Sequence, residues 1–283
     1  MKKISVLAMA LIAIFASCEP ICDSYEIGKG ITAEELKAAS SVTVVQENGV
    51  NVNRIKCNST AAALTSWTNG VEVVNAAYGE FTMLLLGDQT VTVTALNPDG
   101  STVSAEFPVK IDAYSPNFPV PPEWAIFCGS GAKDWTWDDD ASAFGGNCWG
   151  NMGYQSGDPE SVASGGGMWW GVPPSGVADQ AGNYGFNRAD GEGAVMTFQL
   201  AGTKIVKSSG AVGTFKFDMN STNSANIGTL STTGDGILFP CEINTGTSIS
   251  KFEINRLNEQ QLVLSESTNA AWGEATYWRF KAK

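Results

Sequence analysis

The sequence predicts an all-β protein made of two β-sandwich domains, and three observations lead to this fold class. Short apolar runs alternate with turn signals such as Asn97-Pro98-Asp99-Gly100 along most of the chain. Charged residues make up 16% and aromatic residues 10% of the chain, with 31 Gly and 9 Trp, a profile typical of sheets joined by glycine-rich loops. A proline-rich segment at 114–122 divides the 283 residues into two parts, each long enough for its own core.

The first 17 residues have the pattern of a secretion signal. Two lysines precede an apolar run of about twelve residues, shorter than the ~20 that a permanent membrane-spanning helix needs. The run ends in Phe15-Ala16-Ser17-Cys18, which resembles a bacterial lipobox, whose cysteine is lipidated and becomes the first residue of the mature protein. Acidic residues at positions 19, 23 and 26 resemble the tethers of Gram-negative lipoproteins that face the cell exterior. We therefore expect lipidation at Cys18 and a place on the outer membrane, with the lipid anchor as the membrane contact.

Residues 18–40 are expected to form a tether and one short helix, and residues 41–113 the first β-domain. The helix is predicted over 31–40, because Thr32 and Glu35 have the capping-box spacing. Strands are predicted where short apolar runs are separated by turns, at 41–45, 71–74, 81–86, 91–95 and 103–111. Strands of this length and spacing favour a β-sandwich.

Three segments of this domain carry a resemblance to a known family. Trp67-Thr68-Asn69-Gly70, Gly79-Glu80-Phe81-Thr82-Met83 and the segment 90–100 are similar to the PKD family of Ig-like domains, with Asn69 where that family usually has an aspartate. The resemblance implies an Ig-like sandwich that acts as a rigid spacer on a cell-surface protein. Trp67 is then expected in its core.

The four prolines of the 114–122 linker favour an extended, semi-rigid spacer before the second domain at 123–283. Strands are predicted there at 123–127, 195–200, 214–219, 237–239, 250–257, 261–265 and 275–282, and a long loop region at 129–193. Alternation in the last three strands indicates antiparallel sheet, and we expect a jelly-roll-like sandwich. For the final hairpins, an eight-stranded barrel with an apolar internal pocket is the alternative.

The second domain is also where we expect the ligand, because it holds eight of the nine Trp. Sugar rings present C–H faces that stack on flat aromatic rings and hydroxyls that pair with carboxylates and amides. Trp124, Trp137 and Trp278 are predicted to be core. Trp135 shares a face with Trp137 in an alternating strand, so both are either buried or displayed. The predicted ligand-binding residues are Trp135, Trp149, Trp169, Trp170, Trp272, Asp138 and Asn147.

Composition excludes several functional classes. The chain has no histidine, which removes Ser-His-Asp and Cys-His nucleophiles and histidine-containing metal sites. Its net charge of −12 argues against a nucleic-acid partner, which would be repelled. We predict neither a cofactor nor an enzymatic activity.

The arrangement as a whole resembles the surface glycan-binding lipoproteins of Gram-negative polysaccharide-utilisation systems. It combines a lipobox, a PKD-like spacer, a proline-rich joint and a β-domain rich in Trp and Gly. The resemblance implies a non-catalytic protein that holds a polysaccharide or oligosaccharide at the cell surface for an outer-membrane transporter or hydrolase.

Alternatives remain open at this point. A glycoside hydrolase would use two carboxylates, with candidates at Asp138, Asp140, Glu192, Glu253 and Glu274, and an adhesive surface protein would bind a protein partner instead. The Asp138-Asp139-Asp140 run would suit calcium by its oxygen ligands but lacks a calcium-loop motif. The five cysteines other than Cys18 cannot all pair; Cys128 and Cys148 flank the Trp-rich loop, but burial as free thiols is expected for most.

Overall fold

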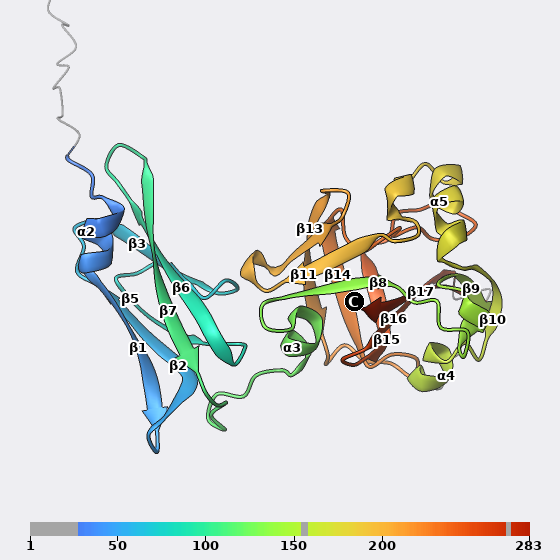
Figure 1. Ribbon diagram of the computed structural model, residues 1–283, viewed down its shortest axis with the longest axis horizontal. Coiled ribbons are helices and arrows are strands. Elements are labelled where there is room, and N and C mark those ends of the chain that lie inside the picture. Colours follow the sequence, from blue (N-terminus) through green and yellow to red (C-terminus); the bar gives the residue numbers. More distant parts are fainter. Residues whose placement is uncertain (1–27, 154–157, 270–272) are drawn as a thin grey trace, which may run out of the picture.

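The computed structural model describes residues 28–153, 158–269 and 273–283, which form two β domains side by side along the long axis of the molecule (Figure 1). The predicted signal segment, the Cys18 lipobox and its acidic tether lie outside the described residues, as does Trp272. None of the described helices has both the length and the apolar character needed to cross a bilayer.

The first domain begins with the predicted helix and continues as two facing sheets. Helix α2 (Ala33–Ala38) has the expected capping box between Thr32 and Glu35. One sheet has the order β1-β2-β5 and the other β4-β3-β6-β7. The strands are β1 (Ser40–Glu47), β2 (Val50–Ser59), β3 (Leu64–Thr68), β4 (Val73–Val74), β5 (Tyr78–Thr82), β6 (Gly87–Leu96) and β7 (Thr102–Ile111).

The core between these sheets confirms the sandwich and the place of Trp67. Trp67 is fully buried, together with Phe81 from the opposite sheet and Val91 and Val93 from β6. Strand β2 is a strand that alternation did not reveal, because its apolar residues are interrupted by Asn, Arg and Lys. Predicted strand 71–74 shrinks to two residues, since the turn before it occupies residues 69–72.

The hydrogen bonds of Asn69 show what an asparagine contributes to this turn, where an aspartate is usual. Its side-chain carbonyl accepts from the Val71 and Glu72 amides at 3.0 and 2.8 Å. Its amide group donates to the Thr82 carbonyl at 3.1 Å, a bond that a carboxylate is unable to make. The turn is therefore tied to strand β5 as well as closed on itself.

The segment 123–127, predicted as a strand, is instead helix α3 (Glu123–Cys128). Its six residues are too few to separate a buried helix from a strand by pattern alone. Pro121 and Pro122 precede it and fit a helix start. Segment 237–239 is also not a strand, although Ile237, Leu238 and Phe239 are all completely buried.

The second domain is a closed eight-stranded antiparallel barrel, so the predicted jelly-roll-like sandwich is wrong. Strands run in the order β8-β11-β12-β13-β14-β15-β16-β17, and β17 pairs again with β8 through Phe280 and Trp137. The barrel strands are β8 (Ala132–Trp137), β11 (Val195–Gln199), β12 (Lys204–Lys207), β13 (Val212–Asp218), β14 (Gly228–Gly234), β15 (Lys251–Leu257), β16 (Gln261–Asn269) and β17 (Glu274–Ala282). From β11 onward each strand pairs with the next along the chain, whereas a jelly roll requires long crossings between two sheets.

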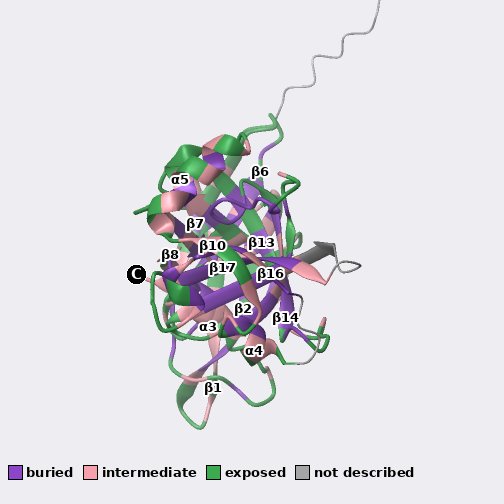
Figure 2. Ribbon diagram, turned by 90° about the vertical axis from the view of Figure 1, so that its right-hand side faces the viewer, coloured by how far each residue is buried: buried purple, intermediate pink, exposed green. Residues whose placement is uncertain are grey.

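The barrel interior is filled by side chains. Inward residues of all eight strands, such as Trp135, Phe198, Phe252 and Trp278, belong to one continuous buried cluster, and Figure 2 shows strands such as β16 coloured as buried. Interior positions of an eight-stranded barrel are just wide enough to be filled in this way. One end also contains a buried ion pair, in which Lys207 Nζ lies 2.9 Å from Asp190 Oδ2.

Between β8 and β11 the chain leaves the barrel and builds an added layer, where the sequence predicted mostly loop. Strand β17 pairs with β9 (Trp149–Gly153) over its first half, and β9 pairs with β10 (Met168–Val172), the last strand of the sheet. The layer also contains the helices α4 (Pro159–Ala163) and α5 (Pro174–Asn183) and the 3-10 turns at Phe144–Gly146 and Arg188–Asp190. It lies at the end of the molecule farthest from the first domain (Figure 1).

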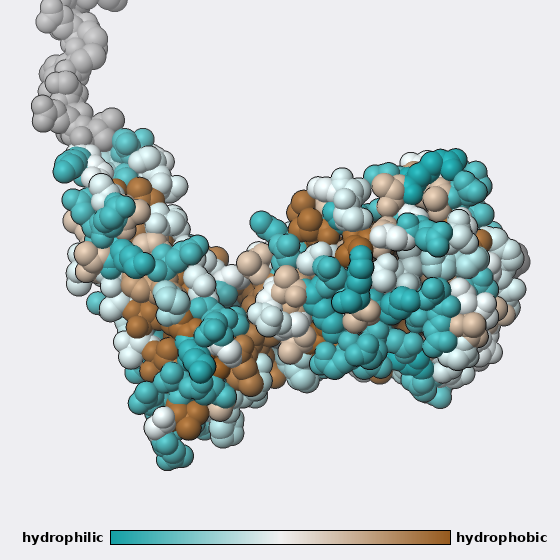
Figure 3. Space-filling model, viewed as in Figure 1, coloured by the Kyte–Doolittle hydropathy of each residue, from teal (hydrophilic) through white to brown (hydrophobic). Residues whose placement is uncertain are grey.

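The two domains are in direct contact. Leu85 of the first domain is only 2% exposed and belongs to the core cluster of the barrel domain, with Val71 and Leu84 packed beside it. The Gly202 N–H donates to the Gly70 carbonyl at 2.6 Å. Apolar residues gather at the surface where the domains meet, whereas the visible face of the barrel is mainly hydrophilic (Figure 3).

Candidate functional site

The seven residues predicted to bind ligand divide sharply by exposure. Trp135 and Trp149 are completely buried and Asp138 is 1% exposed, so the structure does not display them. Trp169 and Trp170 are 58% and 45% exposed. Asn147 is half-buried and donates to the Phe144 carbonyl, and Trp272 lies outside the described residues.

The buried tryptophans are core residues whose indole N–H groups are satisfied by backbone carbonyls. Trp135 donates to Phe127, and Trp149 to Cys241. Trp137 and Trp278 do the same and are buried, which confirms the core prediction for both. A buried indole needs such a partner, and these four rings have found theirs inside the protein.

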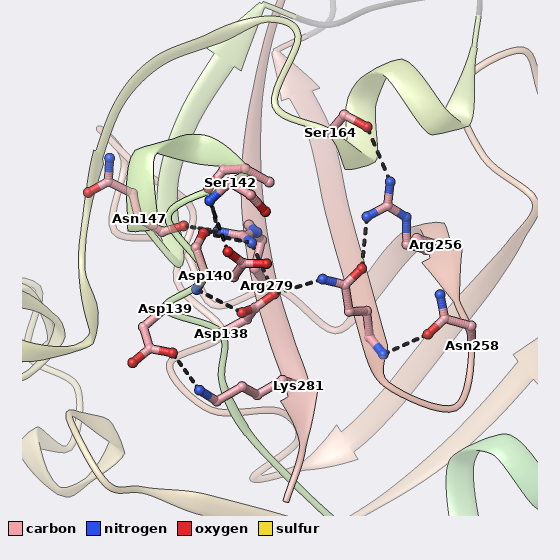
Figure 4. A network of polar contacts seen from close by, with 12 residues as sticks. Asp138, Asp139, Asp140, Ser142, Asn147, Ser164, Arg256, Asn258, Arg279 and Lys281 are labelled. Carbon is pink, nitrogen blue, oxygen red and sulfur yellow. Dashed lines mark hydrogen bonds and ion pairs between the residues drawn. The ribbon is translucent and has the colours of Figure 1, made fainter.

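Asp138 is held in a buried ion pair with Arg279 (Figure 4). Arg279 Nη2 lies 3.0 Å from Asp138 Oδ2, and both side chains are at most 2% exposed. Arg279 Nη1 also donates to the carbonyls of Ala143 and Asn147 at 3.0 and 2.8 Å. This one guanidinium therefore fixes the loop that leads from β8 into β9.

Around this pair the polar contacts become exposed and weaker. Asp139 pairs with Lys281, which holds the pKa of Asp139 below its ordinary value, and both side chains are largely exposed. Gln261 joins Asp138 to Arg256, which pairs in turn with Glu160 of α4. Arg256 also donates to the hydroxyl of Ser164, the C-cap residue of α4 (Figure 4). The network fastens the added layer to the barrel.

Trp169 owes its exposed position to a β-bulge and a glycine. In the β9–β10 pairing, Met168 faces Met152 and Trp170 faces Asn151, so Trp169 is the extra residue of the bulge. Its indole lies over Gly153: a Cβ placed on that glycine would come 3.2 Å from Trp169 Nε1. The ring therefore rests directly on bare backbone, and Trp169 remains 58% exposed.

Trp170 is supported by the core on the same face of the sheet. Its ring meets buried Trp149 edge-on, with centroids 6.2 Å apart and planes at 84°. Trp149, Asn151 and Gly153 alternate along β9 and so share one face. We call the exposed pair Trp169 and Trp170 the tryptophan platform.

Polar side chains border the platform on that face. Glu274 faces Gly153 across the β17–β9 pairing, which puts its side chain on the same side as the Trp169 ring. Glu274 Oε1 accepts from Asn151 Nδ2 and from Asn244 Nδ2, both at 2.7 Å. The Asn244 backbone N–H also donates to the Tyr184 hydroxyl at 3.2 Å. Two amides and a carboxylate thus have fixed positions beside two exposed indoles.

A small cavity of about 20 Å³ continues this polar border inward. Its lining includes the carboxylates of Glu242, Glu266 and Glu274 together with Thr276. Its volume suits about one water molecule. Among the described residues, no group of three or more Cys, Asp or Glu is arranged to hold a metal ion.

Of the five carboxylates considered for hydrolysis, Glu274 is the one at the platform. Asp138 is sequestered by Arg279, and Asp140 caps the Ser142 amide at 2.9 Å. Glu253 lies on β15 and accepts from Asn223 at 2.6 Å. Glu192 lies across a separate groove that Lys281 also lines.

The four described cysteines are buried free thiols, so Cys128 and Cys148 do not close the loop between them. Burial raises the pKa of the Cys57 thiol to about 11 and that of Cys128 to about 12. Burial likewise raises the pKa of Cys148 and Cys241. Inert buried thiols are the expected result of such surroundings.

The sequence identified the two platform tryptophans but missed their polar partners. Asn151 and Asn244 lie 93 residues apart in segments without a motif. The β9–β17 pairing brings Asn151, and the turn at residues 243–245 brings Asn244, to one carboxylate. Glu274 was considered only as a catalytic residue. The one local signal was the alternation of Trp149, Asn151 and Gly153, which becomes visible once β9 is recognised as a strand.

Comparison with known proteins adds information about the first domain. No model of a known protein family matches the chain, and no curated protein does. The crystal structure of the PKD1 domain from the Vibrio cholerae metalloprotease PrtV is similar at 15% identity and a TM-score of 0.21, over 26% of this chain and 94% of that one. The PKD1 domain of Vibrio anguillarum Epp is similar at 11% identity and a TM-score of 0.20, over 26% and 95%. Each similarity extends over about a quarter of this chain and nearly the whole of the PKD1 domain compared.

Proposed function

We propose that this protein is a non-catalytic glycan-binding lipoprotein of the cell surface, and that it binds polysaccharide on the tryptophan platform. The observation that carries the proposal is the pair of exposed indoles, Trp169 and Trp170, next to Asn151, Asn244 and Glu274. Flat rings stack on the C–H faces of a sugar, while the exposed Asn244 amide and the Glu274 carboxylate bond its hydroxyls, and half-buried Asn151 holds the carboxylate in place.

Preorganisation supports this use of the platform. The Trp169 ring rests on Gly153 and the Trp170 ring against Trp149, so neither has to be ordered by the ligand. The Asn151 and Asn244 amides are likewise held in place by Glu274. Binding loses less free energy to ordering when the contact groups are already fixed.

The position of the platform also supports a role in holding a polymer. Strand β10 is the last strand of its sheet, so no further strand walls off the platform on that side. The layer lies at the end of the molecule opposite the first domain (Figure 1). With lipid at Cys18, the PKD-like domain would hold the platform away from an outer membrane, where an outer-membrane transporter or hydrolase partner receives the glycan.

The test is native affinity electrophoresis of a soluble form comprising residues 19–283, in gels that contain soluble polysaccharides. Reducing-end release is measured in the same mixtures. We expect retardation without cleavage. Trp169→Ala and Trp170→Ala should each weaken binding at least about tenfold, the equivalent of ~1.4 kcal/mol.

Leu64→Ala is the matched control, because Leu64 is 76% exposed and lies in the first domain. This variant should be retarded like the unmodified protein. Retardation that survives loss of both platform tryptophans would contradict the proposed site. Release of reducing ends that Glu274→Gln abolishes would indicate a hydrolase, and no retardation by any polysaccharide would favour a protein partner.

A further inference from the structure

The polar border of the platform is negatively charged, and this charge affects which glycans can bind there. Glu274 is the central group of the border, and Glu242 and Glu266 line the cavity behind it. Among the described residues that form the platform, its border and this cavity, none is Lys or Arg. The site therefore has negative charges and no local cation to pair with an acidic sugar.

Glu274 is oriented as a hydrogen-bond acceptor. Two amide N–H groups meet at its Oε1, and both distances are 2.7 Å. A carboxylate has about four acceptor positions on its two oxygens, so two amides leave capacity for hydroxyl donors. Bonds from a neutral donor to a carboxylate are shorter and stronger than bonds between neutral groups.

The same carboxylates oppose an acidic ligand. A uronate or sulfate placed on the platform would bring a second negative charge close to Glu274 in surroundings that are partly shielded from water. The protein as a whole is also negative, with 29 acidic residues against 17 basic ones, so long-range attraction would not offset this repulsion. The unfavourable term is absent for a neutral sugar.

We propose that the tryptophan platform is selective for neutral polysaccharides, whose hydroxyl groups donate to Glu274, and excludes polymers that carry carboxylate or sulfate groups. The proposal rests on the proposed function and adds to it the substrate class and the residue that sets it. Glu274 is then a specificity-determining residue, distinct from the stacking residues Trp169 and Trp170.

The test first compares neutral with acidic polymers and then compares one neutral polymer with a charged derivative of the same backbone. The neutral probes are mixed-linkage β-glucan, xyloglucan, galactomannan and arabinan, and the acidic probes are polygalacturonate, alginate and chondroitin sulfate. The neutral polymer that retards the protein most is then tested against its own carboxymethylated derivative. We expect the neutral form to bind at least about tenfold more tightly, with little dependence on salt, because no ion pair forms.

Glu274→Gln keeps the shape of the side chain and its acceptor oxygen for the two amides. We expect it to weaken binding of the neutral polymer about fivefold and to narrow the gap between neutral and carboxymethylated forms. Glu34→Gln is the control, since it removes the same charge from an exposed position in the first turn of α2. That variant should leave both affinities unchanged.

The outcomes separate this proposal from the proposed function. Trp169-dependent binding of acidic polymers as tight as that of neutral ones would overturn neutral selectivity and leave the glycan-binding function intact. If Glu274→Gln leaves the ratio of the affinities for neutral and acidic polymers unchanged, Glu274 does not determine the selectivity. No binding by any polymer, neutral or acidic, would overturn both.

Discussion

The Asp138 side chain lies against the Arg279 guanidinium in the interior, although its sequence context of Trp and Asp pointed to a ligand site. Breaking a buried ion pair by removing one partner leaves the other charge unpaired and is costly. We predict that Asp138→Ala lowers the free energy of unfolding by about 3–5 kcal/mol, measured by urea denaturation.

The control for this prediction is Asp139→Ala, one residue along the chain. Asp139 pairs with Lys281, but the two side chains are 62% and 42% exposed. Solvent screening limits such a pair to at most about 1 kcal/mol. Equal losses for the two variants would contradict the structural role of Asp138.

The buried thiols make a second residue-scale prediction, which concerns alkaline pH. The ordinary thiol pKa is 9.0, and burial raises it to about 11 for Cys57 and about 12 for Cys128. Above pH 9 the unfolded chain loses thiol protons that the folded protein keeps, so stability is complete below that pH and falls as pH rises toward the folded pKa values. Each such thiol contributes a slope of up to about 1.4 kcal/mol per pH unit.

Denaturation midpoints between about pH 8 and 10.5 test this, and Cys128→Ala should flatten the decline. In a Cys22→Ser form of residues 19–283, Ellman's reagent at pH 8 should label the native protein only as fast as it unfolds. Rapid labelling of native protein would show that the thiols are accessible.

At the scale of elements, the platform depends on the close contact between the Trp169 side chain of β10 and the Gly153 backbone of the neighbouring strand β9. Gly153→Ala would put a methyl group 3.2 Å from Trp169 Nε1, so the indole has to shift, and its exposed position lets it do so. We predict weaker polysaccharide binding, about threefold to tenfold, with a change of less than about 1 kcal/mol in stability. Affinity electrophoresis and thermal unfolding of the same sample measure both.

Gly171→Ala serves as the contrasting variant. Its Cβ would come 2.0 Å from the hydroxyl of Tyr277, a fully buried residue. That variant should lose much more stability than Gly153→Ala. Similar unfolding temperatures for the two would mean that β10 is free to move as a whole.

Local signals predicted some elements well and others poorly. The capping box located α2, and alternation located β6, β7 and the closing strands β15 to β17. Helix α3 was misread because six mostly apolar residues fit a strand and a helix equally. The added layer was missed because its short strands are rich in Gly, which weakens the local signals for a strand. These strands are formed instead by pairing between segments that lie far apart in the sequence.

The same limit explains the candidate site. The sequence does not show where along a sheet a tryptophan lies, so Trp149 and Trp169 looked alike although both rings lie on one face and only Trp149 is buried. The bulge at Trp169 also brings its ring to that face, because strict alternation along β10 would point Trp169 to the side opposite Trp170. A prediction based on strand periodicity does not include the one-residue shift that a bulge introduces.

At the scale of the whole molecule, the contact between the domains passes through Gly70. Its φ is +96°, a region that favours glycine, and a Cβ there would lie 3.3 Å from the Ala201 Cα. We predict that Gly70→Val separates the domains and raises the radius of gyration in small-angle X-ray scattering. The 114–122 linker should then be cut faster by proteases.

Gly100→Val is the control, because Gly100 also has a positive φ, +83°, but has nothing within 4 Å of its Cβ position. It carries the local strain without the contact to Ala201. If the radius of gyration rises equally in both variants, strain in the turn causes the change and loss of the contact with Ala201 does not.

The sequence predicted a barrel only as the alternative for the final hairpins, since closure rests on the pairing of Phe280 with Trp137 across more than half of the second domain. Closure has a consequence for the order in which the two domains fold during synthesis. Strand β17 pairs with β16, β9 and β8, so the pairing of these three strands is incomplete until β17 is present. The first domain can fold as soon as β7 has been synthesised, but the barrel has no complete circuit of hydrogen bonds until β17 is present. Until then the edges of β8, β9 and β16 are open to mispairing, and a chain that stops before Glu274 should become a substrate for chaperones and proteases.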